Sequence, residues 1–91
     1  MSSIIQNKLN GKMAESYAIS DLRKNGFTVI RFTKCDFIAL SRIINWFIEV
    51  KYNKSRLSKN QKKFRSFCRR RKLNFLVYRV TPAQLEESRK H

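Results

Sequence analysis

Residues 45–51 constrain this chain more than any other stretch, because they place an acid among strand-forming residues. Aromatic and β-branched residues predict a β-strand here. Side chains alternate along a strand, so Glu49 and Lys51 point to one face while Ile48 and Val50 point to the other. A Glu and a Lys two residues apart often form only a solvated face. The apolar neighbours indicate an interior strand instead, where an unpaired carboxylate is costly, and this favours a functional role for Glu49.

A second acid, Asp36, is predicted to lie beside Glu49. Residues 36–41 also read as a strand, and a tight connection over residues 42–44 would join the two strands as an antiparallel hairpin. Counted back from this turn, Asp36 lies near the open end of the hairpin, as Glu49 does. Carboxylate and carbonyl oxygens are the ligands that hard cations prefer. We therefore predict a metal held by Asp36, Glu49 and a strand carbonyl, that of Val50.

The chain is strongly basic, because 21 Lys and Arg against 6 Asp and Glu give a formal net charge of +15. From Lys51 to Lys72 there are eleven basic residues, with aromatic residues among them and no acid. Such charge can serve solubility alone or bind an acidic membrane, but its concentration in one stretch favours nucleic acid. The residues expected to contact DNA are Lys54, Arg56, Lys59, Lys62, Lys63, Arg69 and Arg70. Carboxylates beside such a surface point to a metal and to phosphodiester chemistry.

Length and composition indicate a single domain over residues 1–91. A domain of this size buries roughly 60% of the surface that its unfolded chain exposes, and 42% hydrophobic residues suffice for one core. No apolar run is long enough to span a bilayer and no signal-peptide core is present, so we expect an intracellular protein with no membrane partner. Cys35 and Cys68 lack metal-ligand spacing and should be free thiols, although a single disulfide would suit a thermophilic setting.

The N-terminal part is expected to form one helix and one strand before the hairpin. Residues 10–25 carry an apolar stripe at helical spacing, made of Ala14, Ala18 and Leu22. Gly26 supplies a left-handed stop, and residues 1–9 are either a frayed end or a short extra turn. Glu15 lies beside the stripe, and helical phase alone leaves open whether it is exposed. Residues 27–32 alternate and predict a first strand.

The C-terminal part begins with a polar loop over residues 51–57. Ser58 is a helix N-cap with Gln61 as its capping-box partner, and Gln61 can serve both the cap and a site beneath it. Residues 74–80 predict a last strand, followed by a short helix and a tail over residues 86–91. The order α-β-β-β-α-β suits a crossover between parallel strands, so we expect an α/β fold with a mixed sheet flanked by helices.

Four segments resemble, in order, the motifs of one enzyme family. They are residues 11–15 with the following helix and strand start, residues 36–39, residues 48–51 and residues 57–61. In this order the chain resembles the PD-(D/E)xK nuclease superfamily, and within it the small archaeal and viral Holliday-junction-resolvase-like nucleases. The resemblance extends to about residue 85, and it implies a restriction-endonuclease-like core.

The resemblance also implies a role for each matching residue. Asp36 and Glu49 would hold Mg²⁺ or Mn²⁺, and Glu15 would support that metal or a second one. Lys51 would orient the attacking water and stabilise growing negative charge, while Gln61 would steady the site. The implied activity is metal-dependent DNA endonuclease cleavage, in branched, Holliday-junction-like DNA. The alternative is a non-catalytic basic DNA-binding module on the same fold, since fold does not guarantee function.

A homodimer is expected on symmetry grounds. A four-way junction has two scissile strands related by approximate two-fold symmetry, so coordinated cleavage needs two sites in an isologous dimer. The predicted hairpin tip gathers Ile43, Ile44 and Trp46. These apolar residues either pack on the domain's own core or are covered by a second copy. We predict that the hairpin region or an adjacent edge lies in the interface.

Overall fold

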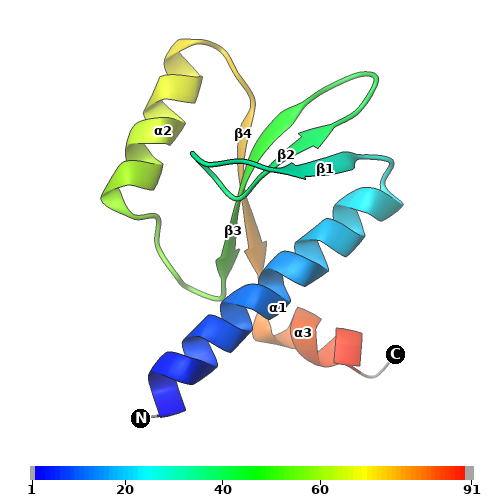
Figure 1. Ribbon diagram of the computed structural model, residues 1–91, viewed down its shortest axis with the longest axis vertical. Coiled ribbons are helices and arrows are strands. Elements are labelled where there is room, and N and C mark those ends of the chain that lie inside the picture. Colours follow the sequence, from blue (N-terminus) through cyan, green and yellow to red (C-terminus); the bar gives the residue numbers. More distant parts are fainter. Residues whose placement is uncertain (1, 90–91) are drawn as a thin grey trace.

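A computed structural model describes residues 2–89, and the side chains of residues 9–88 (Figure 1). The elements in chain order are α1 (Ser2–Lys24), β1 (Thr28–Arg31), β2 (Phe37–Leu40), β3 (Trp46–Tyr52), α2 (Lys59–Arg70), β4 (Phe75–Val80) and α3 (Pro82–Arg89). This confirms the predicted α-β-β-β-α-β order and the short helix after the last strand.

One mixed sheet forms the centre of the molecule, with strand order β1-β2-β3-β4. The pairs β1–β2 and β2–β3 are antiparallel, whereas β3 and β4 are parallel and joined by α2 as the crossover helix. Phe37 pairs with Ile48 in the β2–β3 hairpin, so the residue before Phe37 lies next to Glu49. The predicted hairpin and its register are therefore present.

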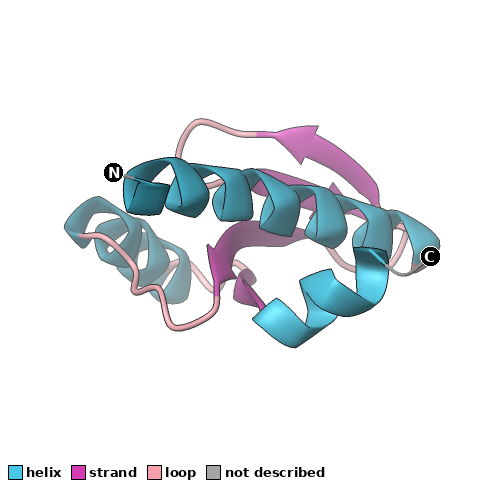
Figure 2. Cartoon of the chain, turned by 90° about the horizontal axis from the view of Figure 1, so that it is seen from below, coloured by secondary structure: helices cyan, strands magenta, loops and turns pink. Residues whose placement is uncertain are grey.

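The two long helices serve opposite faces of this sheet. On β3, Ile48 and Val50 join the core cluster with residues of α1, whereas Phe47 packs against Phe64 of α2. Alternation along the strand then places Glu49 on the α2 face with Phe47. α3 lies beside α1 in both views, and α2 lies away from α3 (Figures 1 and 2).

The core lies between α1 and the sheet. Ala14, Ala18 and Leu22 are buried, as the apolar stripe predicted, and they pack with apolar residues of the strands and α3: Phe37, Ala39, Ile48, Val50, Val80 and Leu85. Two alanines in successive turns allow the helix backbone to approach the sheet closely. Gly26 ends this helix region with a φ of +89°, and the Phe27 amide donates to the Leu22 carbonyl at 3.0 Å, as in a left-handed helix stop.

Several element boundaries differ from the predicted ones. α1 begins at Ser2, so residues 2–9 are neither frayed nor a single extra turn; they contain no glycine or proline that would stop a helix. β3 continues to Tyr52, so the polar loop starts two residues later than expected. α3 continues to Arg89, and most of the expected tail is helical. Met1 and residues 90–91 lie outside the described part of the chain.

No helix in the described part of the chain is long and apolar enough to cross a membrane.

Candidate functional site

Asp36 lies at the open end of the β2–β3 hairpin, where it extends the pairing beyond Phe37. Its amide donates to the Ile48 carbonyl at 3.1 Å, and its side-chain Oδ2 accepts from the Val50 amide at 2.7 Å. The carboxylate thus takes the place of the next backbone acceptor of the ladder. These two hydrogen bonds fix Asp36 beside Glu49, which is the arrangement that the sequence predicted.

Glu49 is buried, with 3% of its surface exposed, and it is the one buried charged residue in the described part of the chain. Burial raises the pKa of Glu49 to about 8. The hydrogen bond with Asp36 and the negative charge of Asp36 raise this pKa further, whereas the positive charge of Lys51 lowers it. The side chain is therefore largely protonated at neutral pH in the metal-free protein.

Gln61 links the start of α2 to Glu49. Its Oε1 accepts from the Ser58 amide at 2.7 Å, while the Ser58 hydroxyl accepts from the Gln61 amide at 3.2 Å, so the predicted capping box is formed. Its Nε2 donates to Glu49 Oε2 at 3.1 Å. The side-chain amide therefore serves the cap and the buried acid together.

Glu15 reaches the same region from α1, on the opposite face of the sheet. Burial raises the pKa of Glu15, the charge of Asp36 adds to the rise, and Arg31 opposes it. Arg31 Nη2 lies 4.0 Å from Glu15 Oε2. Helical phase left the direction of Glu15 open, and the structure turns it toward Asp36. Glu15 and Glu49 thus both interact with Asp36.

Lys51 lies on β3, two residues after Glu49 and on the same face, where it is half-buried. It pairs in parallel register with Arg79 of β4. Arg79 Nη1 donates to the carbonyls of Asn53 and Ser55, both at 2.7 Å. This guanidinium ties down the loop between β3 and α2, a role that no pattern in the sequence indicated, because it depends on the pairing of distant strands.

The residues at the hairpin opening suit a divalent cation in chemistry. Asp36 and Glu49 supply carboxylate oxygens, and the Val50 carbonyl faces the same strand edge as the amide that Asp36 accepts from. Mg²⁺ commonly takes one or two carboxylates and keeps several waters. Within the described residues, however, no group of three or more His, Cys, Asp and Glu side chains is arranged to hold a metal ion. Glu15, Asp36 and Glu49 are therefore not arranged as a three-ligand metal site.

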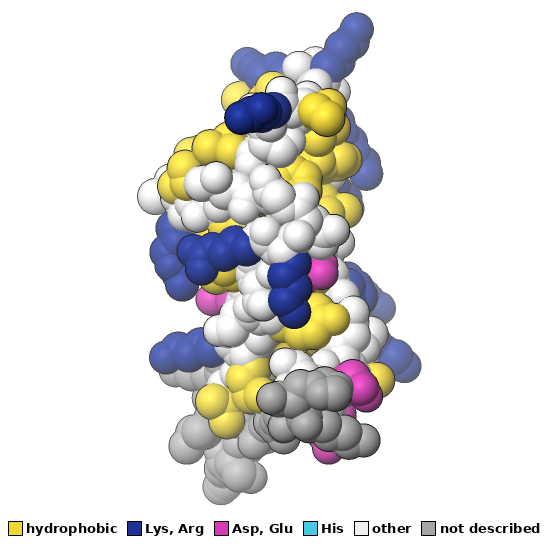
Figure 3. Space-filling model, turned by 90° about the vertical axis from the view of Figure 1, so that its right-hand side faces the viewer, with side chains coloured by type: hydrophobic (Ala, Val, Ile, Leu, Met, Phe, Trp, Pro, Cys, Tyr) yellow, Lys and Arg dark blue, Asp and Glu magenta, His cyan; other side chains and the backbone are white. Residues whose placement is uncertain are grey.

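The basic residues predicted to contact DNA lie in the loop before α2 and on α2 itself, and all are exposed: Lys54, Arg56, Lys59, Lys62, Lys63, Arg69 and Arg70. On α2 they are spaced by three, four or seven residues, which places them in one stripe along the helix. Lys and Arg are also spread over the side of the molecule seen in Figure 3, where Asp and Glu are few.

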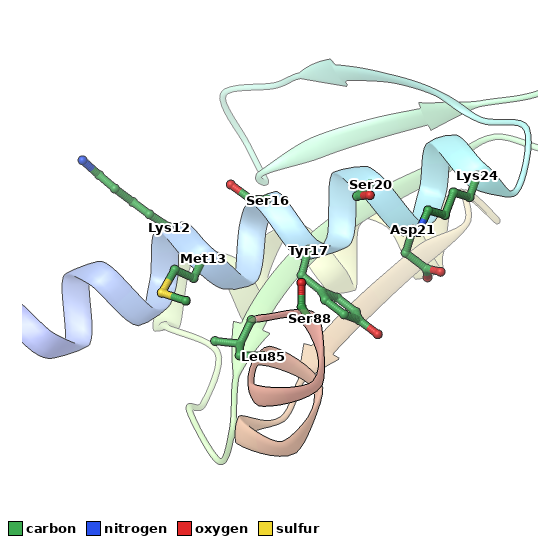
Figure 4. A pocket seen from close by; sticks show the side chains of 9 residues that line it. All are labelled: Lys12, Met13, Ser16, Tyr17, Ser20, Asp21, Lys24, Leu85 and Ser88. Atoms are coloured by element: carbon green, nitrogen blue, oxygen red, sulfur yellow. The ribbon is translucent and has the colours of Figure 1, made fainter. Parts of the chain in front are cut away.

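Two hollows of the surface contain acidic side chains. One, of about 940 Å³, lies beside α2 and is lined in part by Asp36, Glu49 and Gln61. The other, of about 430 Å³, lies between α1 and α3 (Figure 4). Its acid, Asp21, accepts a hydrogen bond from the Tyr78 hydroxyl and so fastens α1 to β4. The α2 hollow contains the buried acid, and it is the candidate site.

Cys35 and Cys68 are both buried free thiols, as predicted. Burial raises the pKa of Cys35 to about 11, and the thiol donates to the Phe37 carbonyl at 3.2 Å. Cys68 is the buried residue of α2. Neither thiol is a nucleophile at neutral pH.

No family model matches the chain, and no curated protein sequence matches it. Among solved structures, a VRR_NUC domain superposes with a TM-score of 0.70 at 20% identity, covering 90% of this chain and 96% of that one. The Hjc Holliday junction resolvase of Archaeoglobus fulgidus superposes with a TM-score of 0.62 at 28% identity, covering 79% of this chain and 65% of the resolvase. The chain therefore spans just under two thirds of the resolvase. It shares its fold with both structures, in agreement with the resemblance predicted from its motifs.

Proposed function

We propose that this protein is a divalent-metal-dependent endonuclease that hydrolyses phosphodiester bonds in branched DNA. Its main support is the buried acid Glu49, held beside Asp36 in a chain whose formal net charge is +15. A carboxylate that is buried next to another carboxylate destabilises the fold unless a cation or proton compensates it. The likeness to a Holliday junction resolvase, at 28% identity, supports branched DNA as the substrate.

Asp36, Glu49 and the Val50 carbonyl would hold Mg²⁺ or Mn²⁺, with Glu15 in support. The bound cation would lower the pKa of a water molecule and neutralise charge on the scissile phosphate. Gln61 orients the Glu49 carboxyl through its 3.1 Å hydrogen bond. Lys51 presents a positive charge on the face of Glu49, where it orients the attacking water and stabilises the negative charge that grows on the phosphate.

The basic stripe of α2 holds the DNA backbone. Phosphate contacts fix the position of a duplex and carry no sequence information, so we propose binding that depends steeply on salt and little on base sequence. A homodimer would present two such sites to the two scissile strands of a junction.

A cleavage assay on end-labelled DNA tests the proposal. The substrates are a four-way junction, a flap, a nicked duplex and a plain duplex, each incubated with Mg²⁺, with Mn²⁺ and with EDTA. We expect cation-dependent cleavage of branched DNA that Asp36→Asn and Glu49→Gln abolish. DNA binding is kept or tightened, because Asp36→Asn removes a negative charge and Glu49→Gln adds none. Glu86→Gln, at an exposed position of α3, is the control. Cleavage that persists in both variants, or in EDTA, contradicts the proposal.

The second candidate is a non-catalytic DNA-binding module. It is favoured by the lack of a ready three-ligand metal group in the described part of the chain. The same assay separates the two functions, since a module would bind every substrate and cut none with either cation.

A further inference from the structure

The hollow beside α2 has an aromatic wall. Phe64 is the centre of a ring cluster, with centroid distances of 5.3 Å to Phe47, 5.9 Å to Phe67, 6.0 Å to Phe75 and 6.2 Å to Phe32. The Phe64 and Phe67 planes are nearly parallel, at 13°. Four of these rings line the hollow of about 940 Å³ that also contains Asp36 and Glu49. Aromatic surface and the candidate catalytic acids therefore share one space.

Two of the rings are only partly covered by the protein. Phe32, in the connection from β1 to β2, is 36% exposed, and Phe67 of α2 is 37% exposed. The Arg71 guanidinium lies over the Phe67 ring, 4.0 Å from its centroid, so the two groups form a stacked pair. The two rings stand at the rim of the hollow, where a planar ligand could contact them.

The remaining lining indicates the chemistry of that ligand. Lys34 and Lys63 bring positive charge to the rim, and the polar side chains of Thr33, Ser58 and Asn60 offer hydrogen bonds. A planar group with polar edges, attached to an anionic backbone, matches this combination. Bases of single-stranded nucleic acid stack on Phe, Tyr and Trp rings and on Arg planes, in grooves that are positively charged.

We propose that this hollow binds a DNA base that has left the double-helical stack, with Phe32 and the Arg71–Phe67 pair as its stacking surfaces. The inference rests on the proposed function in taking DNA as the ligand, and it adds a base-binding site next to the scissile phosphate. The preferred substrate then carries unpaired nucleotides at the cleavage position, as at a flap or a distorted branch point.

Equilibrium binding in EDTA tests the site without cleavage. Two fluorescent DNAs of equal charge are compared by anisotropy, a plain duplex and a duplex with an unpaired stretch at its centre. Stacking of one base makes the second DNA bind roughly tenfold more tightly, a difference of about 1.4 kcal/mol. Phe32→Ala and Phe67→Ala should each lower this ratio toward one. Leu76→Ala should not, since Leu76 is 39% exposed but does not line the hollow.

Two further variants separate stacking from packing. Phe32→Leu keeps an apolar side chain without an aromatic face and should lose the preference, whereas Phe32→Trp keeps a face and should retain it. Circular dichroism melts identify any variant that fails to fold. The proposal is overturned if wild type binds both DNAs equally, or if Phe32→Leu keeps the preference. It is also overturned if Phe67→Ala converts a dimer into a monomer in sedimentation, because a second copy then covers these rings.

The outcome is independent of the cleavage assay. A preference for unpaired DNA without cleavage of any substrate supports the base-binding site and contradicts the proposed nuclease activity. Cleavage by wild type without such a preference supports the nuclease activity and contradicts the base-binding site.

Discussion

The two faces of the sheet are built in different ways. On the α1 face, Ala14 and Ala18 are 1% and 0% exposed and pack directly over the strands. On the α2 face, Cys68 is the buried residue of the described helix, Phe67 is 37% exposed, and a hollow of about 940 Å³ remains beside the helix. The α1 face is closely packed through small residues, whereas the α2 face has large aromatic rings and a hollow.

This difference separates stability from function in a chain of 91 residues. The buried apolar cluster draws on α1, α3 and the strand positions that face them. The buried acid, the half-buried lysine and the basic stripe lie on the α2 side. A small domain has few residues to divide between a core and a binding surface, and here each of the two long helices serves mainly one of them.

After the acids Asp36 and Glu49, the largest expected effect is on the α2 face, at Lys51. Lys51→Ala should lower the cleavage rate by a factor of about 10² to 10³, because it removes a positive charge placed where negative charge grows. DNA affinity should change far less. Single-turnover cleavage and anisotropy binding measure the two quantities, with Lys24→Ala on α1 as the control. Equal losses of affinity and rate would instead show that Lys51 only helps to bind DNA.

Substitutions on the α1 face should lower the free energy of unfolding more than substitutions on the α2 face. Ala18→Leu inserts three carbons where the helix meets the sheet, and should destabilise the protein by about 2–3 kcal/mol. Phe67→Ala on the α2 face should cost less, about 1 kcal/mol, because its ring is partly exposed. Urea unfolding measures both. A larger loss from Phe67→Ala would overturn the assignment of stability to the α1 face.

Glu49 is predicted to make the metal-free protein less stable as the pH rises. Its folded pKa of about 8 lies above its usual 4.5. The folded state therefore binds more protons than the unfolded state between these values, and the stability that this confers is lost as the pH rises through about 8. Thermal melts in EDTA at about pH 5 and about pH 9 should show the loss.

Glu49→Gln should flatten that profile and stabilise the protein at the higher pH by about 2 kcal/mol, the order of a buried polar group's desolvation cost. Glu86→Gln, which is exposed, is the control. A wild-type melting temperature equal at both pH values would contradict the predicted titration.

A smaller effect is expected where α2 leaves the sheet uncovered, at the hairpin tip. Ile43 is 95% exposed and Ile44 is 36% exposed, and Ile30 of β1 is 48% exposed. If a second copy covers this region, light scattering should give twice the mass of 10.9 kDa. Ile43→Glu should then weaken the dimer by about 1.5 kcal/mol or more, while Leu9→Glu on α1 should not. If light scattering shows only monomer, both free and on junction DNA, the proposed junction-resolving function is contradicted, whereas the proposed nuclease activity is not.

The smallest effect belongs to single lysines of the basic stripe. Lys62→Ala or Lys63→Ala should reduce the slope of log affinity against log salt by about 0.9 for each lost duplex contact. Lys24→Ala on α1 should leave the slope unchanged. An equal change at Lys24 would mean that DNA contacts both faces.

Local patterns predicted much of this arrangement. The proximity of Asp36 and Glu49 follows from a hairpin with a short connection, and the double use of Gln61 follows from a capping box next to a strand end. The direction of Glu15 could not be predicted, because it depends on where α1 crosses the sheet. Nor could the contacts of Arg79 or the exposure of Phe32, which arise only when distant elements pack. The sequence thus predicted neighbours along hairpins and helix ends, and it missed the hollow that the second helix leaves beside the sheet.

In the proposed function, the shared amide of Gln61 would link DNA binding by α2 to the orientation of Glu49. Lys59, Lys62 and Lys63 lie in the first turns of α2, whose cap is closed by Gln61. A phosphate backbone that immobilises these turns also immobilises the amide that orients Glu49. DNA binding would then make the orientation of the Glu49 carboxyl more rigid than the hydrogen bond with Gln61 does alone. Discrimination between DNA shapes can arise in this way without any contact to a base.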